Sequence, residues 1–347
     1  MCWGSLRRKG WRMKGRYHFR VKSKKVLFDF TLRRNITVIK GDSATGKTTL
    51  LHMLYEYLRT GRESGYSVSA DAPYYVYLRR EVGMEWEDML FRLKDTIIFI
   101  EENNEFVFSE KFAAFVKASG NYFVLVNRAP FKMLPYGVHE IYEIVTAGKH
   151  ADVKESYHYF RELYSNYPFA ENNRAACAIT EDSNAGFQFF SHVLKDSRLV
   201  SAGGNGNILR CLEENAQGDV LAIVDGAAFG AMVEGCVEYI NIQGNQRITL
   251  WMPESFEYLI LRSGLIPSGE LADILASPWD YAEAGDYESW ERFFTQLLIS
   301  MTKDTPFQYS KHALNPSYLQ DISVRKITDT FPPAVRSRLN FGKEHPT

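Results

Sequence analysis

The stretch NITVIKGDSATGKTTLL, residues 35–51, decides the fold of the first part of this chain. Its β-branched run at 36–39 predicts a buried strand, and residues 47–58 carry apolar side chains at helical spacing. Between them lies the pattern Gly41-x-x-x-x-Gly46-Lys47-Thr48. Glycines at 41 and 46 permit backbone angles and close approaches that a Cβ atom would block. The sequence therefore predicts a strand that turns sharply through a glycine loop into a helix.

This arrangement is typical of a phosphate-binding loop. The free N–H groups and the dipole of a helix N-terminus favour a bound anion. Lys47 is expected to reach the β- and γ-phosphates of a nucleotide, and the Thr48 hydroxyl to coordinate Mg²⁺. The expected ligands are therefore ATP and Mg²⁺. The nucleotide-binding residues predicted in the loop are Gly41, Asp42, Ser43, Ala44, Thr45, Gly46, Lys47, Thr48 and Thr49.

A second strand, Thr96–Glu102 (TIIFIEE), has large apolar residues closed by two carboxylates. It resembles the Walker B strand of P-loop ATPases of the ABC and AAA type. The resemblance implies that Glu101 takes part in the Mg²⁺ shell and that Glu102 polarises the attacking water, with Lys47 and Glu102 as the catalytic residues. One departure is that Glu101 stands where the family usually has Asp. The alternative is a core strand that leads into an acidic loop.

The strand expected at Tyr122–Val126 ends in Asn127 and Arg128. Asn127 resembles the γ-phosphate sensor of ATPases that have a second strand between the phosphate loop and the Walker B strand. An ordinary strand-end cap is the alternative. The chain has no LSGGQ-like signature of an ABC dimer and no arginine-rich lid of a small-molecule kinase.

Composition and charge place the chain among soluble globular proteins. No apolar run reaches the length needed to span a bilayer, so no membrane partner is expected, and four scattered cysteines favour reduced thiols in the cytoplasm. Residues 1–25 hold ten Lys or Arg and no acid. Such a basic arm is either solvated or able to contact nucleic acid or an acidic partner. Met1 and Met13 are both possible starts of the working protein.

The α/β rhythm restarts after residue 173. Strands are expected at 175–180, 199–201 and 220–224, and these alternate with helices. This part resembles a Toprim domain, as in the OLD-type nucleases that join an ATPase to a Toprim module. The resemblance rests on Glu181 at a strand end, the GGNGN turn at 203–207, and Asp225 in VDGAAFG.

The Toprim resemblance implies that Glu181 and Asp225 are Mg²⁺-associated acids, with Glu254 or Glu257 as a further acid. The chain departs from the family at Ala227, where the Asp-x-Asp pair would have its second acid. Two-metal cleavage needs several carboxylates, so nuclease activity is not expected to follow from the resemblance alone. Asp182 is a possible substitute, and the alternative is a generic α/β domain.

The fold class expected is α/β, with a phosphate-loop domain on a parallel sheet and a second, Toprim-like α/β domain. The domains expected are a basic arm at 1–16, the phosphate-loop domain at 17–150, a helical linker at 151–172, the Toprim-like domain at 173–270, and a mainly helical segment at 271–347. In that segment, the apolar face of a helix at 287–301 packs on its own domain or meets a protein partner or a second copy.

The sequence favours an ATP-binding protein, with slow Mg²⁺-dependent hydrolysis, whose nucleotide state controls a Toprim-like module that acts on or senses nucleic acid. The resemblance implies a setting in bacterial defence or DNA repair. The competing interpretation is a nucleotide-controlled interaction protein whose second domain is inactive. A small-molecule phosphotransferase is disfavoured because the lid is missing.

Overall fold

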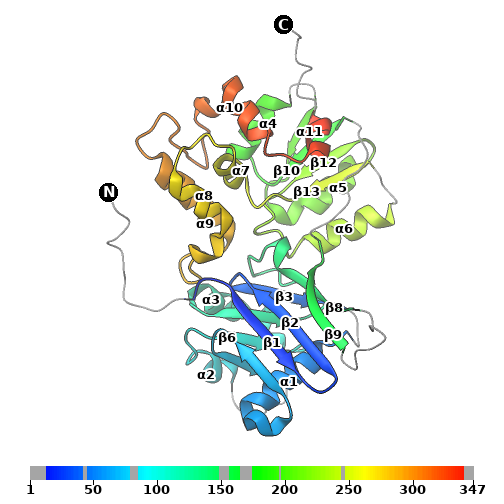
Figure 1. The fold of residues 1–347 in the computed structure, drawn as a ribbon. Helices are drawn as coiled ribbons and strands as arrows, with labels where there is room; N and C mark the ends of the chain where they lie inside the picture. The colour runs from blue at the N-terminus through cyan, green and yellow to red at the C-terminus, as the bar shows by residue number, and fades with distance from the viewer. Residues whose placement is uncertain are drawn as a thin grey trace. The chain divides into compact units, whose positions relative to one another are not determined.

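The computed structural model of the protein describes residues 13–41, 45–78, 85–147, 156–164, 174–194, 197–243 and 247–339. The chain forms two compact units (Figure 1). Unit 1 comprises Met1–Ala129, Glu140–Glu162 and Ser277–Glu288, and unit 2 comprises Pro130–His139, Leu163–Ala276 and Ser289–Thr347. The predicted domain boundaries are therefore wrong in two places. Residues 130–139 belong to unit 2, although the residues on both sides of them belong to unit 1. Residues 277–288 belong to unit 1, although the residues on both sides of them belong to unit 2.

Unit 1 is built on one sheet of nine strands. Its strands are β1 (Tyr17–Lys22), β2 (Val26–Leu32), β3 (Ile36–Lys40), β4 (Ser67–Ala70), β5 (Tyr74–Tyr77), β6 (Ile97–Ile100), β7 (Tyr122–Val126), β8 (Ile141–Ala147) and β9 (Ser156–Glu162). Its helices are α1 (Lys47–Thr60), α2 (Trp86–Leu90) and α3 (Glu110–Ala118). The strand order is β4-β1-β2-β9-β8-β3-β7-β6-β5.

The sheet of unit 1 is mixed, so the expectation of a parallel sheet holds for only part of it. Strands β8, β3, β7, β6 and β5 are parallel to one another, and β2 is parallel to β9. By contrast, β1 pairs antiparallel with β2 and β4, and β8 pairs antiparallel with β9. The antiparallel β1 and β2 confirm the hairpin-like alternation of residues 17–32. The predicted helical linker at 151–172 is wrong where it is described, because 156–162 form β9, which pairs with β2 and β8.

Strand β7 lies between β3 and β6. Ile36 pairs with Phe123 of β7, and Tyr122 pairs with Ile97 of β6. Every residue of these three strands is buried, as expected for parallel strands covered on both faces. Because parallel strands end at the same edge of a sheet, the glycine loop, Asn127 and Glu101 follow neighbouring strand ends.

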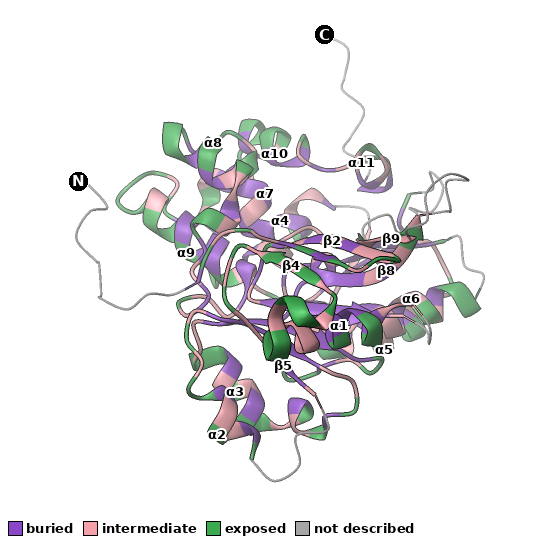
Figure 2. Cartoon of the chain, turned by 60° about the horizontal axis from the view of Figure 1, so that its bottom comes forward, coloured by how far each residue is buried: buried purple, intermediate pink, exposed green. Residues whose placement is uncertain are grey.

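Helix α1 carries both buried and exposed residues (Figure 2). Its buried positions Leu50, Leu51, Met53 and Leu54 join the core of unit 1. This confirms the helical spacing read from residues 47–58. The apolar stripe anchors the helix on the sheet and so fixes the place of its first residue, Lys47.

Residues 277–288 belong to unit 1 because they bind its N-terminal chain. The Ala284 N–H donates to Met13 O (3.1 Å), and the Gly15 N–H donates to Trp279 O (2.7 Å). The guanidinium groups of Arg16 and Arg33 lie 5.2 and 5.5 Å from the centre of the Trp279 ring. Of the predicted basic arm at 1–16, residues 1–12 lie outside the described residues.

Unit 2 has a parallel sheet of four strands in the order β11-β10-β12-β13. The strands are β10 (Cys177–Thr180), β11 (Arg198–Ser201), β12 (Val220–Ile223) and β13 (Ile248–Trp251). The helices are α4 (Ala185–Val193), α5 (Ile208–Asn215), α6 (Val233–Ile242), α7 (Phe256–Arg262), α8 (Gly269–Ala276), α9 (Trp290–Thr302), α10 (Asp321–Thr328) and α11 (Pro333–Leu339). The chain is thus α/β in both units.

Helix α9 packs its apolar face within unit 2. Phe294 is fully buried, and its ring lies 4.7 Å from that of Tyr258 on α7. The expected packing on its own domain is therefore confirmed, although that domain includes the helices that were assigned to a separate C-terminal segment. No helix among the described residues is long and apolar enough to cross a bilayer.

Candidate functional site

The glycine loop of unit 1 has the backbone that its sequence requires. Gly41 and Gly46 have φ values of 120° and 101°, in the region that favours glycine. A Cβ atom on Gly46 would also lie 3.3 Å from the Phe28 ring. Gly46 precedes the first residue of α1, and its carbonyl accepts from the Leu50 N–H (2.9 Å). The loop therefore delivers Lys47 at a helix N-terminus.

Lys47 is 7% exposed. Its Nζ donates to the Gly41 carbonyl oxygen and to Thr45 Oγ1, the latter at 3.2 Å. The amine is thus held inside its own loop, among groups that accept hydrogen bonds. The predicted residues Asp42, Ser43 and Ala44 lie outside the described residues.

A pocket of about 440 Å³ opens at this loop. We name it the Lys47 pocket. Its lining residues are Val26, Phe28, Thr45, Gly46, Lys47, Thr48, Thr49, Glu102, Arg128 and His158. The pocket has a cationic and polar side at the loop and an apolar, aromatic side from β2 and β9.

Of the acids after β6, Glu102 lines the Lys47 pocket and Glu101 does not. Glu102 Oε1 lies 3.2 Å from Arg128 Nε, which follows β7. Asn127 is buried, and its side-chain oxygen Oδ1 accepts from the Ala129 N–H (3.0 Å). Asn127 is not among the described residues that line the pocket. The structure therefore brings together Lys47, Thr48 and Glu102, with Arg128 in the place expected for Asn127.

His158 is a pocket residue that sequence reasoning missed. Its ring stacks on Phe28 with centroids 4.7 Å apart, and its Nδ1 lies 3.0 Å from Thr146 Oγ1. Burial lowers the pKa of His158. No motif in the sequence could have identified it, because β9 reaches the pocket only through its pairing with β2 and β8.

The two acids predicted in unit 2 lie at neighbouring strand ends. Glu181 follows β10 and Asp225 follows β12, and these strands are adjacent and parallel. From β10 the chain continues to β11 on one side of the sheet, and from β12 it continues to β13 on the other side. In open α/β sheets, ligands bind at such a switch point, outside the carboxyl ends of the strands. The Asp225 N–H donates to Glu181 Oε2 (3.4 Å).

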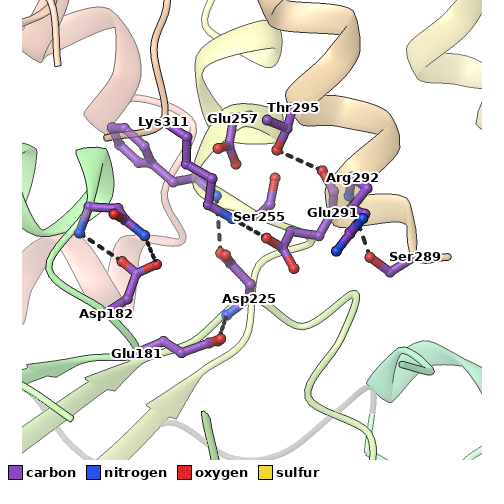
Figure 3. A network of polar contacts seen from close by, with 12 residues as sticks. Glu181, Asp182, Asp225, Ser255, Glu257, Ser289, Glu291, Arg292, Thr295 and Lys311 are labelled. Atoms are coloured by element: carbon purple, nitrogen blue, oxygen red, sulfur yellow. Dashed lines mark hydrogen bonds and ion pairs between the residues drawn. The ribbon is translucent and has the colours of Figure 1, made fainter. Parts of the chain in front are cut away.

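A pocket of about 40 Å³ lies at this switch point, large enough for a few water molecules. We name it the acidic pocket. It is lined by Glu181, Asp182, Asp225 and Glu257, and also by Tyr309 and Lys311. Figure 3 shows these carboxylates with Glu291 of α9 and Lys311 among them.

Hydrogen bonds fix the carboxylates of the acidic pocket. Asp225 Oδ1 accepts from the Phe256 N–H (3.2 Å), and Glu257, which is 2% exposed, accepts from the Tyr309 hydroxyl (2.8 Å). Lys311 forms a close ion pair with Glu291. Because α9 and the loop that carries Lys311 come from the C-terminal segment, sequence reasoning missed both residues of the pair.

The acidic pocket disfavours negative charge. Burial, followed by the charge of Glu291, raises the pKa of Glu181 to about 7. Burial and the charges of Glu291, Glu181 and Glu257 likewise raise the pKa of Asp225 well above its ordinary value. Burial is the largest single influence on Lys311 and opposes its charge, but the carboxylates of Glu291, Glu257 and Asp225 together outweigh it, so the pKa of Lys311 is raised.

The other acids weighed for this site are placed differently. Asp182 accepts from the backbone N–H (3.0 Å) and from the side-chain amide of Asn184. Both of its carboxylate oxygens therefore bind the residue that directly precedes α4. Glu254 is not among the described residues that line the acidic pocket, whereas Glu257 is. Ala227 is 1% exposed and supplies no acid.

The acidic pocket fits a metal only in part. Carboxylates are the ligands that Mg²⁺ prefers, and Glu181 and Asp225 are close together. However, the described part of the chain contains no group of three or more His, Cys, Asp or Glu side chains placed to hold a metal ion. In unit 1, the Thr48 hydroxyl is exposed at the Lys47 pocket, where the phosphates of a nucleotide would complete a Mg²⁺ shell.

Comparison of the chain with models of known families, with curated proteins and with solved structures found no match.

Proposed function

We propose that unit 1 binds ATP with Mg²⁺ and hydrolyses it slowly. The observation that carries this proposal is the position of Lys47, buried at the first turn of α1 inside a loop whose glycines have left-handed φ values. A helix N-terminus and a buried amine together favour a phosphate group. The Lys47 pocket, at about 440 Å³, is large enough for a nucleotide.

Each residue of the Lys47 pocket has a proposed role. Lys47 would exchange its contacts with Gly41 and Thr45 for the β- and γ-phosphates. Thr48 would place its hydroxyl on Mg²⁺, which shields the phosphate charge. Glu102 would accept the proton of the attacking water. The aromatic side formed by Phe28 and His158 would face the rest of the nucleotide.

The pairing of Glu102 with Arg128 suggests how hydrolysis is kept slow. While Arg128 holds the carboxylate, Glu102 is a weaker base. The Arg128 side chain is 57% exposed, and such exposed pairs contribute only about 0–1 kcal/mol. A γ-phosphate could therefore draw Arg128 away and release Glu102.

We further propose that the nucleotide state controls unit 2, a Toprim-like module that acts on or senses nucleic acid. The segment 130–139 supports this link, because it begins two residues after Arg128 and belongs to unit 2. Its Val138 N–H donates to Gly226 O (2.8 Å), and its Tyr136 O accepts from the Gly230 N–H (2.9 Å). These bonds hold the turn that follows Asp225. A shift of Arg128 would thus reach the acidic pocket through ten residues of chain.

A nucleotide-controlled interaction protein with an inactive second domain is the alternative. It is favoured by Ala227, a small buried residue where a two-metal site would need an acid. In this alternative, unit 2 recruits a partner and cleaves nothing.

Nicking of supercoiled plasmid DNA with Mg²⁺ or Mn²⁺, with and without ATP, separates the two. Nicking that disappears in Asp225→Ala supports a nuclease. The absence of nicking under every condition supports the interaction protein. The proposal for unit 1 is tested separately, by ATP binding in calorimetry and by phosphate release.

A further inference from the structure

The sheet of unit 1 has a second face along β1, β2 and β9, which are neighbours in the sheet (Figure 1). Side chains alternate between the two faces of a strand. Phe19, Phe28 and Phe30 lie on one face and are buried in the core with α1. The residues that alternate with them, and their partners on β9, are half-buried or exposed. We name this second face the outer face.

Strand register places two tyrosines beside a row of cations on the outer face. Two rows of residues cross it: Lys22, Leu27 and Tyr157 form one, and Arg20, Asp29 and Tyr159 form the next. Tyr157 is 40% exposed, and its ring stacks with the Tyr159 ring with centroids 6.1 Å apart. A pair of accessible aromatic rings therefore lies two strand spacings, about 10 Å, from the charged residues of β1.

The outer face is positively charged, although the whole chain has a net charge of -1. Its cations are Arg20 and Lys22 on β1 and Arg161 on β9, and all three residues are exposed. Asp29 is the one acid among the outward residues of these three strands, which the structure describes in full. The Asp29 Oδ1 atom lies 2.7 Å from His18 Nε2, so this carboxylate is already paired within the face. Because the local charge is positive, the outer face attracts anions.

A tryptophan between two arginines extends the outer face at one end. Arg16 directly precedes β1 and Arg33 directly follows β2, and the pairing of Tyr17 with Leu32 sets them opposite each other. Their guanidinium groups lie 5.2 and 5.5 Å from the centre of the Trp279 ring. Both arginines are exposed and Trp279 is half-buried. The combination of aromatic rings and cations is thus repeated at this end.

These features together fit a polyanion that also presents flat aromatic groups. Proteins bind single strands with cations that contact the phosphates and with aromatic side chains on which the bases stack. In a duplex the bases are stacked on one another, so exposed protein rings gain no such contact. We propose that the outer face of unit 1 binds single-stranded nucleic acid, with Tyr157 and Tyr159 stacking on bases and the cations of β1 contacting phosphates. This inference goes beyond the role proposed for unit 2 and does not depend on ATP binding.

Binding of a labelled oligodeoxythymidylate to the full-length protein, measured by fluorescence anisotropy without nucleotide or divalent metal, tests the proposal. The strand has about 20 nucleotides, more than the about 4–16 that one OB fold covers. Tyr159→Ala should raise the dissociation constant at least ~5-fold, because a lost base–aromatic stack weakens binding by about that factor or more. Tyr159→Phe keeps the ring and should bind as the wild type does.

Two further variants support the measurement on the aromatic rings. Tyr57→Ala removes a half-buried tyrosine of α1, the helix that packs on the opposite face, and should leave the affinity unchanged. Tyr157→Ala repeats the test at the more exposed ring, and the Tm of each variant verifies that it is folded.

The contribution of charge is tested by the salt dependence of binding. Each phosphate contact to a single strand contributes about 0.7 to the slope of log affinity against log salt concentration. Arg20→Ala should weaken binding and lower this slope by about 0.7, whereas Arg59→Ala, an exposed residue of α1, should change neither. Unlabelled duplex DNA and poly-glutamate should each compete more weakly than the unlabelled single strand.

Three results would overturn the proposal. One is a wild type that does not bind the oligodeoxythymidylate. Another is a wild-type affinity in folded Tyr157→Ala and Tyr159→Ala, which would place the strand on another surface. The third is duplex DNA or poly-glutamate that competes as strongly as the single strand, which would assign the outer face to a duplex or to an acidic protein.

Discussion

Arg128 Nε lies 3.2 Å from Glu102 Oε1 at the edge of the pocket that contains Lys47. The two residues come from the ends of adjacent parallel strands, β7 and β6. The pairing joins the proposed catalytic base to a residue that lies two positions before segment 130–139 of unit 2. It therefore links the chemistry proposed for unit 1 to the control proposed for unit 2.

Glu102→Gln should keep ATP affinity and lose hydrolysis. General bases contribute about 10²–10⁴-fold to a rate, so phosphate release should fall at least ~100-fold while the dissociation constant for ATP changes little. Glu105→Gln, an exposed acid three residues further along the chain, is the matched control and should hydrolyse ATP at the wild-type rate. Undiminished turnover in Glu102→Gln would remove Glu102 from the role of base.

His158 should respond to nucleotide through its pKa. Because burial lowers this pKa from the ordinary 6.5, the stability gained from neutral His158 is fully present above pH 6.5. That stability is lost as the pH falls through the folded pKa. A bound triphosphate would favour the charged imidazole and raise the pKa. NMR titration of the histidine ring protons, assigned with His158→Gln, should show this rise on addition of ATP. A pKa that stays unchanged would place the phosphates away from His158.

Glu140→Ala should destabilise unit 1. Glu140 and Arg34 form an ion pair at 2.9 Å, with side chains only 3% and 8% exposed. Removal of Glu140 takes away the carboxylate of this buried ion pair, and breaking a buried ion pair costs about 3–5 kcal/mol. The comparison is Glu143→Ala, whose partner Arg161 is 57% exposed, and such a pair contributes about 0–1 kcal/mol. Denaturant unfolding measures both, and equal losses would contradict the burial argument.

Gly230→Ala should destabilise unit 2 by displacing segment 130–139. A Cβ atom at this position would lie 2.4 Å from the Tyr136 ring and 2.6 Å from its backbone oxygen. Overpacking of this kind costs about 1–3 kcal/mol. Gly206→Ala, where no atom lies within 4 Å, should leave Tm nearly unchanged. Equal Tm values for the two variants would show that Tyr136 does not hold this turn.

The sequence predicted those features that depend on local pattern. The strand at 122–126 and the start of the helix at Lys47 lie where the apolar spacing and the glycine loop placed them. Glu181 and Asp225 were found because each lies within two residues of the end of a buried strand. These features need only nearby residues to specify them.

The rest depends on contacts between distant parts of the chain. Residues 156–162 form a strand because β2 and β8 offer edges on both sides, although their own sequence was interpreted as helical. Glu291 and Lys311 lie on a helix and a loop with no motif, and only folding brings them to Asp225. Segments 130–139 and 277–288 likewise join units that chain order alone does not indicate.

Binding of ATP by Lys47→Ala tests the central claim most directly. The buried amine is proposed to contact the phosphates, and loss of one partner of a buried charged contact costs about 2–5 kcal/mol, so the dissociation constant should rise ~30-fold or more. Arg59→Ala, an exposed residue on the same helix, is the control and should bind ATP as the wild type does. Calorimetry that shows weak or no binding by Lys47→Ala alone supports the account, and an unchanged affinity would contradict it.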